Sequence, residues 1–270
     1  MHISYSELRV YRQCPKCYRH RYVERLPEKP GRDKLAFWGV VVGKLVEAFY
    51  RERWWADPIM AESDARRFLS AEAQRRTEVK QVDWGPGEFE VGLAKAKAAV
   101  PKILSTVRTE RLLGARNWVE QEMTLPITSG GDTHTVHGRL DLLVEAPDRR
   151  LTLIDGKAGT TLGRRSDPEQ LKLYALMVER HYGQFPARAG FWWFRHGVVR
   201  WKKLTHLSEF AAGLDGTLNR IRRECFAPVV GAHCQWCDYW AACPAGQEQT
   251  AEKAVPGLNL IPGTVTVVGA

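Results

Sequence analysis

Three strand-like segments follow one another in the middle of the chain. Residues 117–128, 134–145 and 151–155 alternate apolar and polar side chains or run apolar, as strands do. Turn-forming residues separate the segments, at 129–132 (Ser-Gly-Gly-Asp) and at 147–148 (Pro-Asp). Strands joined by such short turns pair as antiparallel neighbours. The segments therefore predict a three-strand meander, and the chain must fold around a sheet.

Helical patterns surround this meander. Ser4 and Glu7 form a capping box that opens a short helix to about Gln13. Further helices are expected at 34–55, 59–81, 87–113, 167–182 and 207–225, and a hairpin at 187–195 and 198–204. This order of elements predicts an α/β fold, with a mixed central sheet flanked by helices and a helical insertion at about 57–115.

The chain is basic, with 40 Lys and Arg against 31 Asp and Glu, a formal net charge of +9. Such a balance favours a polyanionic partner, nucleic acid before membrane. No apolar run approaches the roughly 18 residues that span a bilayer, and residues 1–14 lack the apolar core of a secretory signal. We therefore expect a cytoplasmic protein, in which the six cysteines bind metal or stay as buried thiols.

Two carboxylates mark the meander as a candidate site. Asp141 is the only acid inside the apolar run 136–144, and Asp155 and Lys157 end the next strand. Residues two apart on a strand share a face, and pairing of the two strands would bring Asp141 to the same end of the sheet. Converging carboxylates bind hard divalent cations such as Mg²⁺. The other interpretation is a plain turn at Asp155-Gly156 with Lys157 solvated.

Gln170 and Tyr174 form a second candidate pair. They lie four residues apart on one face of the helix expected at 167–182, whose N-terminal end follows Lys157 by about ten residues. That end would offer backbone donors to a phosphate near the carboxylates. A purely structural role for both side chains is the alternative.

In combination, these segments resemble the RecB-like nucleases of the PD-(D/E)XK superfamily, which include the CRISPR-associated RecB-like exonucleases. GRLD at 138–141, IDGKAG at 154–159 and QLKLY at 170–174 resemble three family motifs in the family's order, and the likeness covers most of 3–244. It implies a restriction-endonuclease-like core and a Mg²⁺- or Mn²⁺-dependent DNA nuclease. It also implies metal binding by Asp141 and Asp155, catalysis by Lys157, and DNA contacts by Gln170 and Tyr174.

One position departs from the family pattern. Gly43 stands where the family usually places a metal-binding histidine on a helix, and Glu47 follows one helical turn later on the same face. Some relatives use a helix glutamate, so Glu47 is expected as the third metal ligand and catalytic residue. The alternatives are a surface role for Glu47 and an impaired metal site. Gly43 also suits close helix packing.

The cysteines extend the resemblance. Cys234-x-x-Cys237, Cys243 and the distant Cys14 resemble the iron–sulfur site of the RecB-like branch, in which four thiolates hold a [4Fe–4S] cluster. The competing interpretation is a zinc site made from two C-x-x-C pairs, Cys14 with Cys17 and Cys234 with Cys237. Cys225, at the end of an apolar helical pattern, is expected to be a core thiol.

These expectations define four parts of the chain. An N-terminal segment 1–33 carries one cluster cysteine, 34–226 forms the nuclease core, 227–244 is the cluster loop, and 245–270 is a tail.

The leading hypothesis is an exonuclease or end-processing nuclease acting on single-stranded DNA or duplex ends. Its alternatives are a DNA-binding protein with a degenerate site and a zinc-ribbon nucleic-acid adaptor. The sequence identifies no protein partner.

Overall fold

A computed structural model describes residues 1–28, 32–159, 162 and 166–252. Six strands within these residues form one sheet in the order β1-β3-β4-β5-β6, with β2 paired to β3. β1 runs parallel to β3 and β4 parallel to β5, while the other neighbours are antiparallel. The strands are β1 (His2–Ser4), β2 (Arg116–Ser129), β3 (Asp132–Glu145), β4 (Leu151–Lys157), β5 (Arg188–Trp193) and β6 (Val198–Lys202). The expected α/β fold with a mixed central sheet is confirmed.

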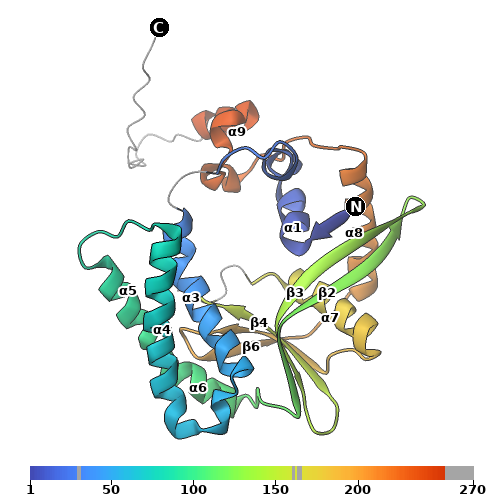
Figure 1. Ribbon diagram of the computed structural model, residues 1–270. Helices are drawn as coiled ribbons and strands as arrows, with labels where there is room; N and C mark the ends of the chain where they lie inside the picture. The colour runs from blue at the N-terminus through green and yellow to red at the C-terminus, as the bar shows by residue number, and fades with distance from the viewer. Residues whose placement is uncertain (29–31, 160–161, 163–165, 253–270) are drawn as a thin grey trace. The chain divides into compact units, whose positions relative to one another are not determined.

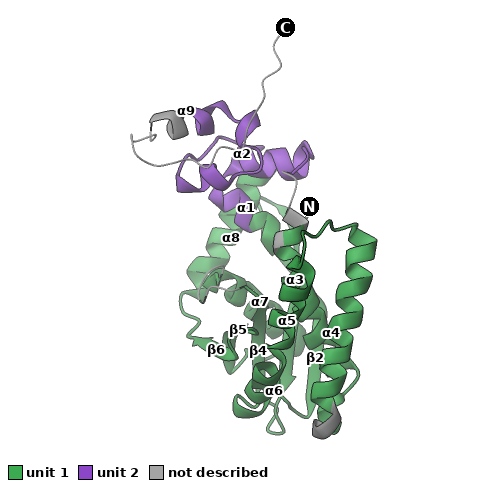
Figure 2. Ribbon diagram, turned by 90° about the vertical axis from the view of Figure 1, so that its left-hand side faces the viewer, with its two compact units in different colours: residues 1–8, 30–223 green, residues 9–29, 224–270 purple. Residues whose placement is uncertain are grey.

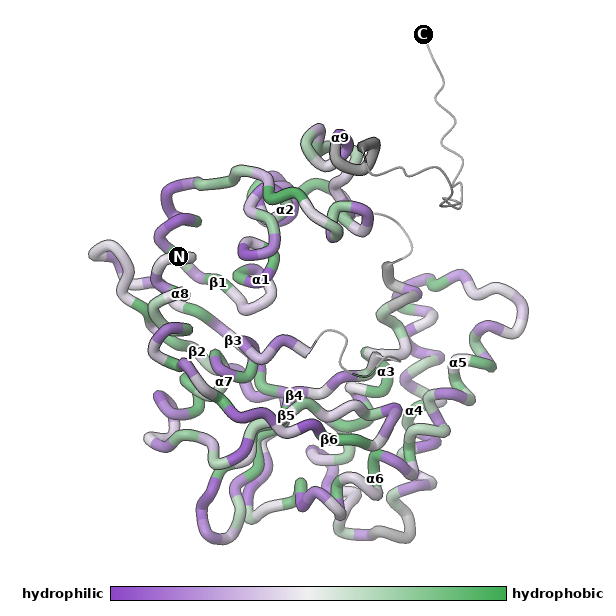
Figure 3. The backbone as a smooth tube through the Cα atoms, turned by 180° about the vertical axis from the view of Figure 1, so that it is seen from behind, coloured by the Kyte–Doolittle hydropathy of each residue, from purple (hydrophilic) through white to green (hydrophobic). Residues whose placement is uncertain are grey.

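The helices of the core flank this sheet (Figure 1). One group packs through an apolar cluster onto buried side chains of β3 to β6, including Leu142, Ile154 and Trp192. This group contains α3 (Arg32–Arg51), α4 (Pro58–Lys80), α5 (Glu88–Lys97) and α6 (Val100–Thr109). A second group contacts β2, β4 and β5 and contains α7 (Pro168–Tyr182) and α8 (Leu207–Arg222). Figure 3 shows mixed polar and apolar colour along these helices, as expected where one side of a helix is buried.

Two local features differ from the sequence-based expectations. The pattern at 87–113 forms two helices, because Pro101 begins a new helix at the first turn of α6 rather than continuing α5. β1 was not expected, since three residues are too few to show alternation. The capping box is confirmed in α1 (Tyr5–Gln13), where Glu7 accepts from the Ser4 backbone at 2.7 Å and Ser4 accepts from the Glu7 backbone at 3.3 Å.

The turn between β2 and β3 fixes the register of the longest strand pair. Gly130 and Gly131 both have positive φ, at 59° and 88°, as a two-residue type I′ hairpin turn requires. Ser129 therefore faces Asp132, and the same offset holds from there to the pair of Arg116 with Glu145. Every cross-strand neighbour of the hairpin follows from this turn.

The chain divides into two compact units, coloured separately in Figure 2. Unit 1 comprises residues 1–8 and 30–223 and contains the sheet. Unit 2 comprises residues 9–29 and 224–270, and its described elements are short. They include α2 (Pro15–Tyr18), the π-helical turn η1 (Arg19–Val23), the 3₁₀ turns η3 (Ala232–Trp236) and η4 (Trp240–Ala242), and α9 (Pro244–Glu252). Residues 253–270 of the expected tail lie outside the described residues. No helix in the described ranges is both long and apolar enough to cross a membrane.

Candidate functional site

Strands β3 and β4 bring Asp141 and Asp155 together. The β3–β4 pairing ends at Leu142 with Ile154, and the two aspartates are the next residues of their strands beyond that pair. Asp141 Oδ2 accepts a hydrogen bond from the Gly156 backbone nitrogen at 2.7 Å. A side chain at Gly156 would collide with the Phe194 ring, 2.3 Å from the ideal Cβ position. The glycine thus leaves room for the ring while its amide group holds Asp141.

The charges of this site are incompletely balanced. Lys157 Nζ lies 2.5 Å from Asp155 Oδ2, and Asp155 is 1% exposed. Burial raises the pKa of both carboxyls, and the pKa of Asp141 reaches about 8 because Asp155 adds to the effect of burial. The half-buried Asp141 and the buried Asp155 have one lysine near them, and the Asp155 Oδ2 makes no well-aligned hydrogen bond despite the ion pair. Oxygen donors with surplus negative charge fit a hard divalent cation.

Helix α7 carries Gln170 and Tyr174 to the same place. Asp167 caps the helix by accepting from the Glu169 backbone nitrogen at 3.0 Å. Lys157 Nζ donates to Gln170 Oε1 at 3.1 Å, and Gln170 Nε2 donates to the Tyr174 hydroxyl at 3.2 Å. Burial raises the pKa of Tyr174, so its hydroxyl stays protonated. A continuous row of polar contacts therefore connects Asp155 to the side chains expected to touch DNA.

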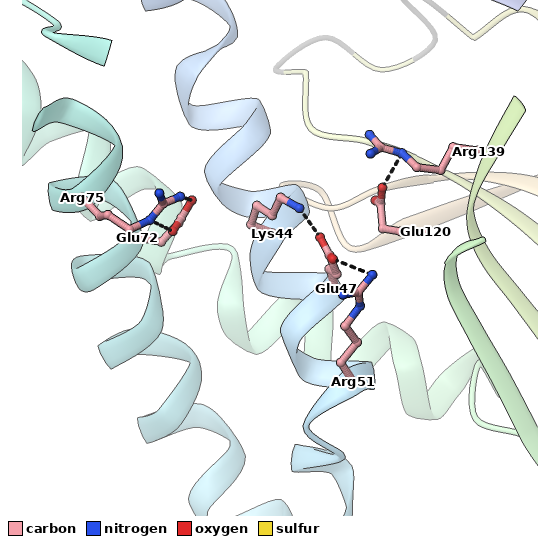
Figure 4. A network of polar contacts seen from close by, with 7 residues as sticks. All are labelled: Lys44, Glu47, Arg51, Glu72, Arg75, Glu120 and Arg139. Atoms are coloured by element: carbon pink, nitrogen blue, oxygen red, sulfur yellow. Dashed lines mark hydrogen bonds and ion pairs between the residues drawn. The ribbon is translucent and has the colours of Figure 1, made fainter. Parts of the chain in front are cut away.

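Glu47 lies apart from this row of contacts. Its carboxylate on α3 is 7% exposed and is held by Lys44 at 2.5 Å and Arg51 at 3.0 Å (Figure 4). Neither cation belongs to the group around Asp141 and Asp155. No atom outside its own stretch of helix lies within 4 Å of an ideal Cβ at Gly43, so close packing against another element does not explain the glycine.

One acid near the site was not singled out from the sequence. Glu120 on β2 raises the pKa of Asp141, after the larger effects of burial and Asp155. In the sequence it resembles any polar residue of an alternating strand. The signal that identifies it is the two-residue turn at Gly130 and Gly131, which fixes the register and places Glu120 opposite Asp141.

Unit 2 gathers five cysteines around one cavity that is partly open to solvent. Its wall includes Cys14, Cys17, Cys234, Cys237 and Cys243. The Sγ atoms of Cys17 and Cys237 lie 3.9 Å apart. The donor set suits a thiolate-bound metal group, and the cavity contains both the four cysteines expected for an iron–sulfur cluster and the four of the zinc alternative. Cys225 is exposed rather than in the core, because α8 ends at Arg222.

Neither the carboxylate pair nor the cysteine group forms a complete binding site for a single ion in the described residues. Within the described ranges, no three His, Cys, Asp or Glu side chains come together as a potential metal site.

Comparison with known proteins identifies the class. Residues 2–244 match the PD-(D/E)XK nuclease superfamily, and the chain belongs to this superfamily. Membership implies a metal-dependent nuclease. No curated protein sequence matches the chain. Among solved structures, one described as "Crystal structure of SSO0001" is 14% identical, with a TM-score of 0.37 over 64% of this chain and 80% of that chain. This likeness is too weak to support a conclusion.

Proposed function

We propose that the protein is a Mg²⁺- or Mn²⁺-dependent deoxyribonuclease that trims or processes DNA ends. The observation that carries the proposal is the pair of Asp141 and the buried Asp155, with Lys157 as their shared counter-charge. A bound divalent cation would supply Lewis-acid activation of water and neutralise charge on the scissile phosphate. The carboxylates would hold the cation, and the Gly156 amide keeps Asp141 in place for this task.

Lys157 is proposed to act on the reacting groups. Its Nζ contacts both Asp155 and the Gln170 side-chain oxygen, which fixes the ammonium at the edge of the carboxylate pair. From there the ammonium orients the attacking water and stabilises charge that develops on the phosphate. The sequence-based proposal that Glu47 is the third ligand requires this carboxylate to leave Lys44 and Arg51.

DNA binding is proposed to involve α7 and the basic surface. Gln170 and Tyr174 lie in the row of contacts that leads away from Lys157, where a strand entering the site would pass. The net charge of +9 supports binding to the phosphate backbone, with an affinity that falls as salt rises. Single strands and duplex ends both suit such a site.

The cavity of unit 2 is proposed to hold a [4Fe–4S] cluster on Cys14, Cys234, Cys237 and Cys243. A cluster joining residue 14 to residues 234–243 would tie distant segments of the chain within one small unit. Its role would be structural, and a reducing cytoplasm would keep the thiols available as ligands. Zinc on Cys14, Cys17, Cys234 and Cys237 is the competing occupant, and metal analysis of anaerobically purified protein distinguishes the two.

The deciding experiment is cleavage of end-labelled DNA by the purified full chain. Single-stranded and duplex substrates are incubated with Mg²⁺, with Mn²⁺ or with EDTA, beside the variant Asp155→Asn. We expect metal-dependent shortening of the substrate by the wild type and none by the variant. DNA binding without cleavage under every condition would instead identify a DNA-binding protein that has lost the nuclease activity.

A further inference from the structure

The first turn of α7 is held by a side chain from the N-terminal end of the chain. Asp167 is the N-cap residue of this helix, and its carboxylate accepts two hydrogen bonds. Oδ1 accepts from the Glu169 backbone nitrogen at 3.0 Å, and Oδ2 accepts from the Tyr5 hydroxyl. The Tyr5 side chain is 6% exposed and lies 162 residues earlier in the sequence. An N-cap residue that is itself anchored fixes where the helix begins as well as how it begins.

Tyr5 is in turn positioned by the central sheet. It follows β1 directly, and β1 pairs with β3, so that Ser4 lies opposite His137. The capping box of Ser4 and Glu7 begins α1 at this point. Four residues after His137, β3 carries Asp141. The Tyr5 hydroxyl therefore connects the beginning of α7 to the strand that holds one of the two candidate metal ligands.

From Asp167 the contacts continue to the reacting groups. The Gln170 backbone nitrogen donates to the Asp167 carbonyl oxygen at 3.0 Å, within the first helical turn. The side-chain oxygen of Gln170 accepts from Lys157 Nζ at 3.1 Å, and the same Nζ lies 2.5 Å from Asp155 Oδ2. Because Gln170 lies on the first turn, the place where α7 begins decides how the lysine is held.

We propose that Tyr5 is a positioning residue of the nuclease site. Through Asp167 it sets the place of the first turn of α7. Gln170 on this turn then holds Lys157 at the carboxylate pair. Tyr5 acts only by placing these groups. The inference rests on the proposed nuclease function, and it gives β1 and the capping box a task, since they bring Tyr5 to the helix.

The test compares full-chain variants in the cleavage of end-labelled DNA with Mn²⁺. Tyr5→Phe keeps the buried ring and removes only the hydroxyl. We expect kcat to fall about 10-fold or more while KM changes by less than about twofold, because a misplacement of about 1 Å in the reacting groups can cost about 100-fold in rate. Tyr50→Phe is the matched control, since the buried Tyr50 hydroxyl donates at 2.7 Å to the backbone oxygen of Leu112 instead. It should keep the wild-type kcat.

A double variant separates positioning from general stabilisation of the fold. If Tyr5 acts through Gln170, Tyr5→Phe should lower kcat in the wild type and add little in a chain that already carries Gln170→Ala. A hydroxyl that only stabilises the fold would give the same loss in both backgrounds. Equal losses in the two backgrounds would overturn the inference, and so would an unchanged kcat in Tyr5→Phe.

A second measurement does not depend on cleavage. Hydrogen exchange of the Glu169 and Gln170 backbone amides reports how firmly α7 begins. Tyr5→Phe should speed this exchange, and Tyr50→Phe should not. Unchanged exchange in Tyr5→Phe would overturn the inference even in a protein without nuclease activity. Faster exchange together with a wild type that cuts no DNA would overturn the proposed function, and the role of Tyr5 in it, while the anchoring of α7 would stand.

Discussion

The two candidate metal-binding regions are built in opposite ways. In unit 1 the carboxylates come from neighbouring strands that are close in sequence. A backbone amide holds Asp141, and a lysine that is itself held by a glutamine pairs with Asp155. In unit 2 the thiols come from residues far apart in the chain, carried by single turns of helix around a partly open cavity. The first site is organised by the sheet, while the second has little regular structure to organise it.

This difference indicates in which unit metal binding contributes to folding. A site formed on a packed sheet exists before the ion arrives, so the ion adds chemistry and relieves repulsion. A site whose walls are short turns gains its order from the ligand bonds, so binding energy is also folding energy. We therefore expect metal removal to change activity in unit 1 and structure in unit 2.

The largest expected effect is in unit 2. Cys14→Ser or Cys243→Ser should abolish iron binding and raise protease sensitivity within residues 9–29 and 224–252, while the sheet of unit 1 keeps its circular dichroism. Cys225→Ser is the matched control, because this cysteine is exposed and not part of the cavity wall. Cys17→Ser tests the zinc alternative, and loss of stoichiometric zinc in this variant would contradict the iron–sulfur proposal.

The next effect concerns the carboxylate site. Asp155→Ala and Lys157→Ala should each slow cleavage by at least about 100- to 1000-fold, because each removes a charge that acts on the reacting groups. Neither should lower the melting temperature by much, since the sheet remains packed. Initial rates of DNA shortening and thermal unfolding measure the two quantities. Cleavage by Lys157→Ala at the wild-type rate would show that the lysine is only a structural counter-ion.

The sequence predicts much of unit 1 because its signals are local. Alternation predicts β2 and β3, and the adjacent strands bring Asp141 and Asp155 together without any long-range information. The contacts of Glu47 could not be predicted this way. Helical spacing places it on the expected face, yet it equally places Lys44 and Arg51 within reach, and these cations hold the carboxylate in the structure.

Glu120 shows a different limit of sequence reasoning. Alternation classifies it as an ordinary polar residue, and its left-handed backbone has no local signature. Only the register set by the turn at Gly130 and Gly131 places it opposite Asp141. In unit 2, the spacing of the cysteines predicts that they meet, but it does not decide which four of the five cavity cysteines bind metal.

A smaller effect is expected at the helix that departs from the family. If Glu47 is a ligand, Glu47→Gln should raise the Mn²⁺ concentration needed for half-maximal cleavage about tenfold. A change of this size is typical of a group that supports a metal site. Gly43→His should begin in open space, because no atom outside its own stretch of helix lies within 4 Å of an ideal Cβ. Cleavage measured against Mn²⁺ concentration compares both variants with the wild type. Unchanged metal dependence in Glu47→Gln would eliminate Glu47 as a ligand.

A further effect is a pH dependence of the stability of the metal-free protein. The pKa of Asp141 rises from 3.8 to about 8 on folding, chiefly through burial. Between these values the folded state keeps a proton that the unfolded state has lost, so stability should fall as pH rises through this window and level off above it. One such group changes the free energy of unfolding by about 1.4 kcal/mol per pH unit.

Urea unfolding in EDTA at pH 5.5, 6.5 and 7.5 measures this slope. Asp141→Asn cannot ionise, so it should flatten the slope and be more stable than the wild type at pH 7.5. The exposed Asp148, changed to asparagine, is the control and should leave the slope as it is. Saturating Mn²⁺ should also flatten the slope, because the cation stabilises the ionised carboxylates that burial disfavours. An equal slope in the wild type and Asp141→Asn would mean that the carboxylate pair is already balanced without metal, and the contrast between the two units would then lose its basis.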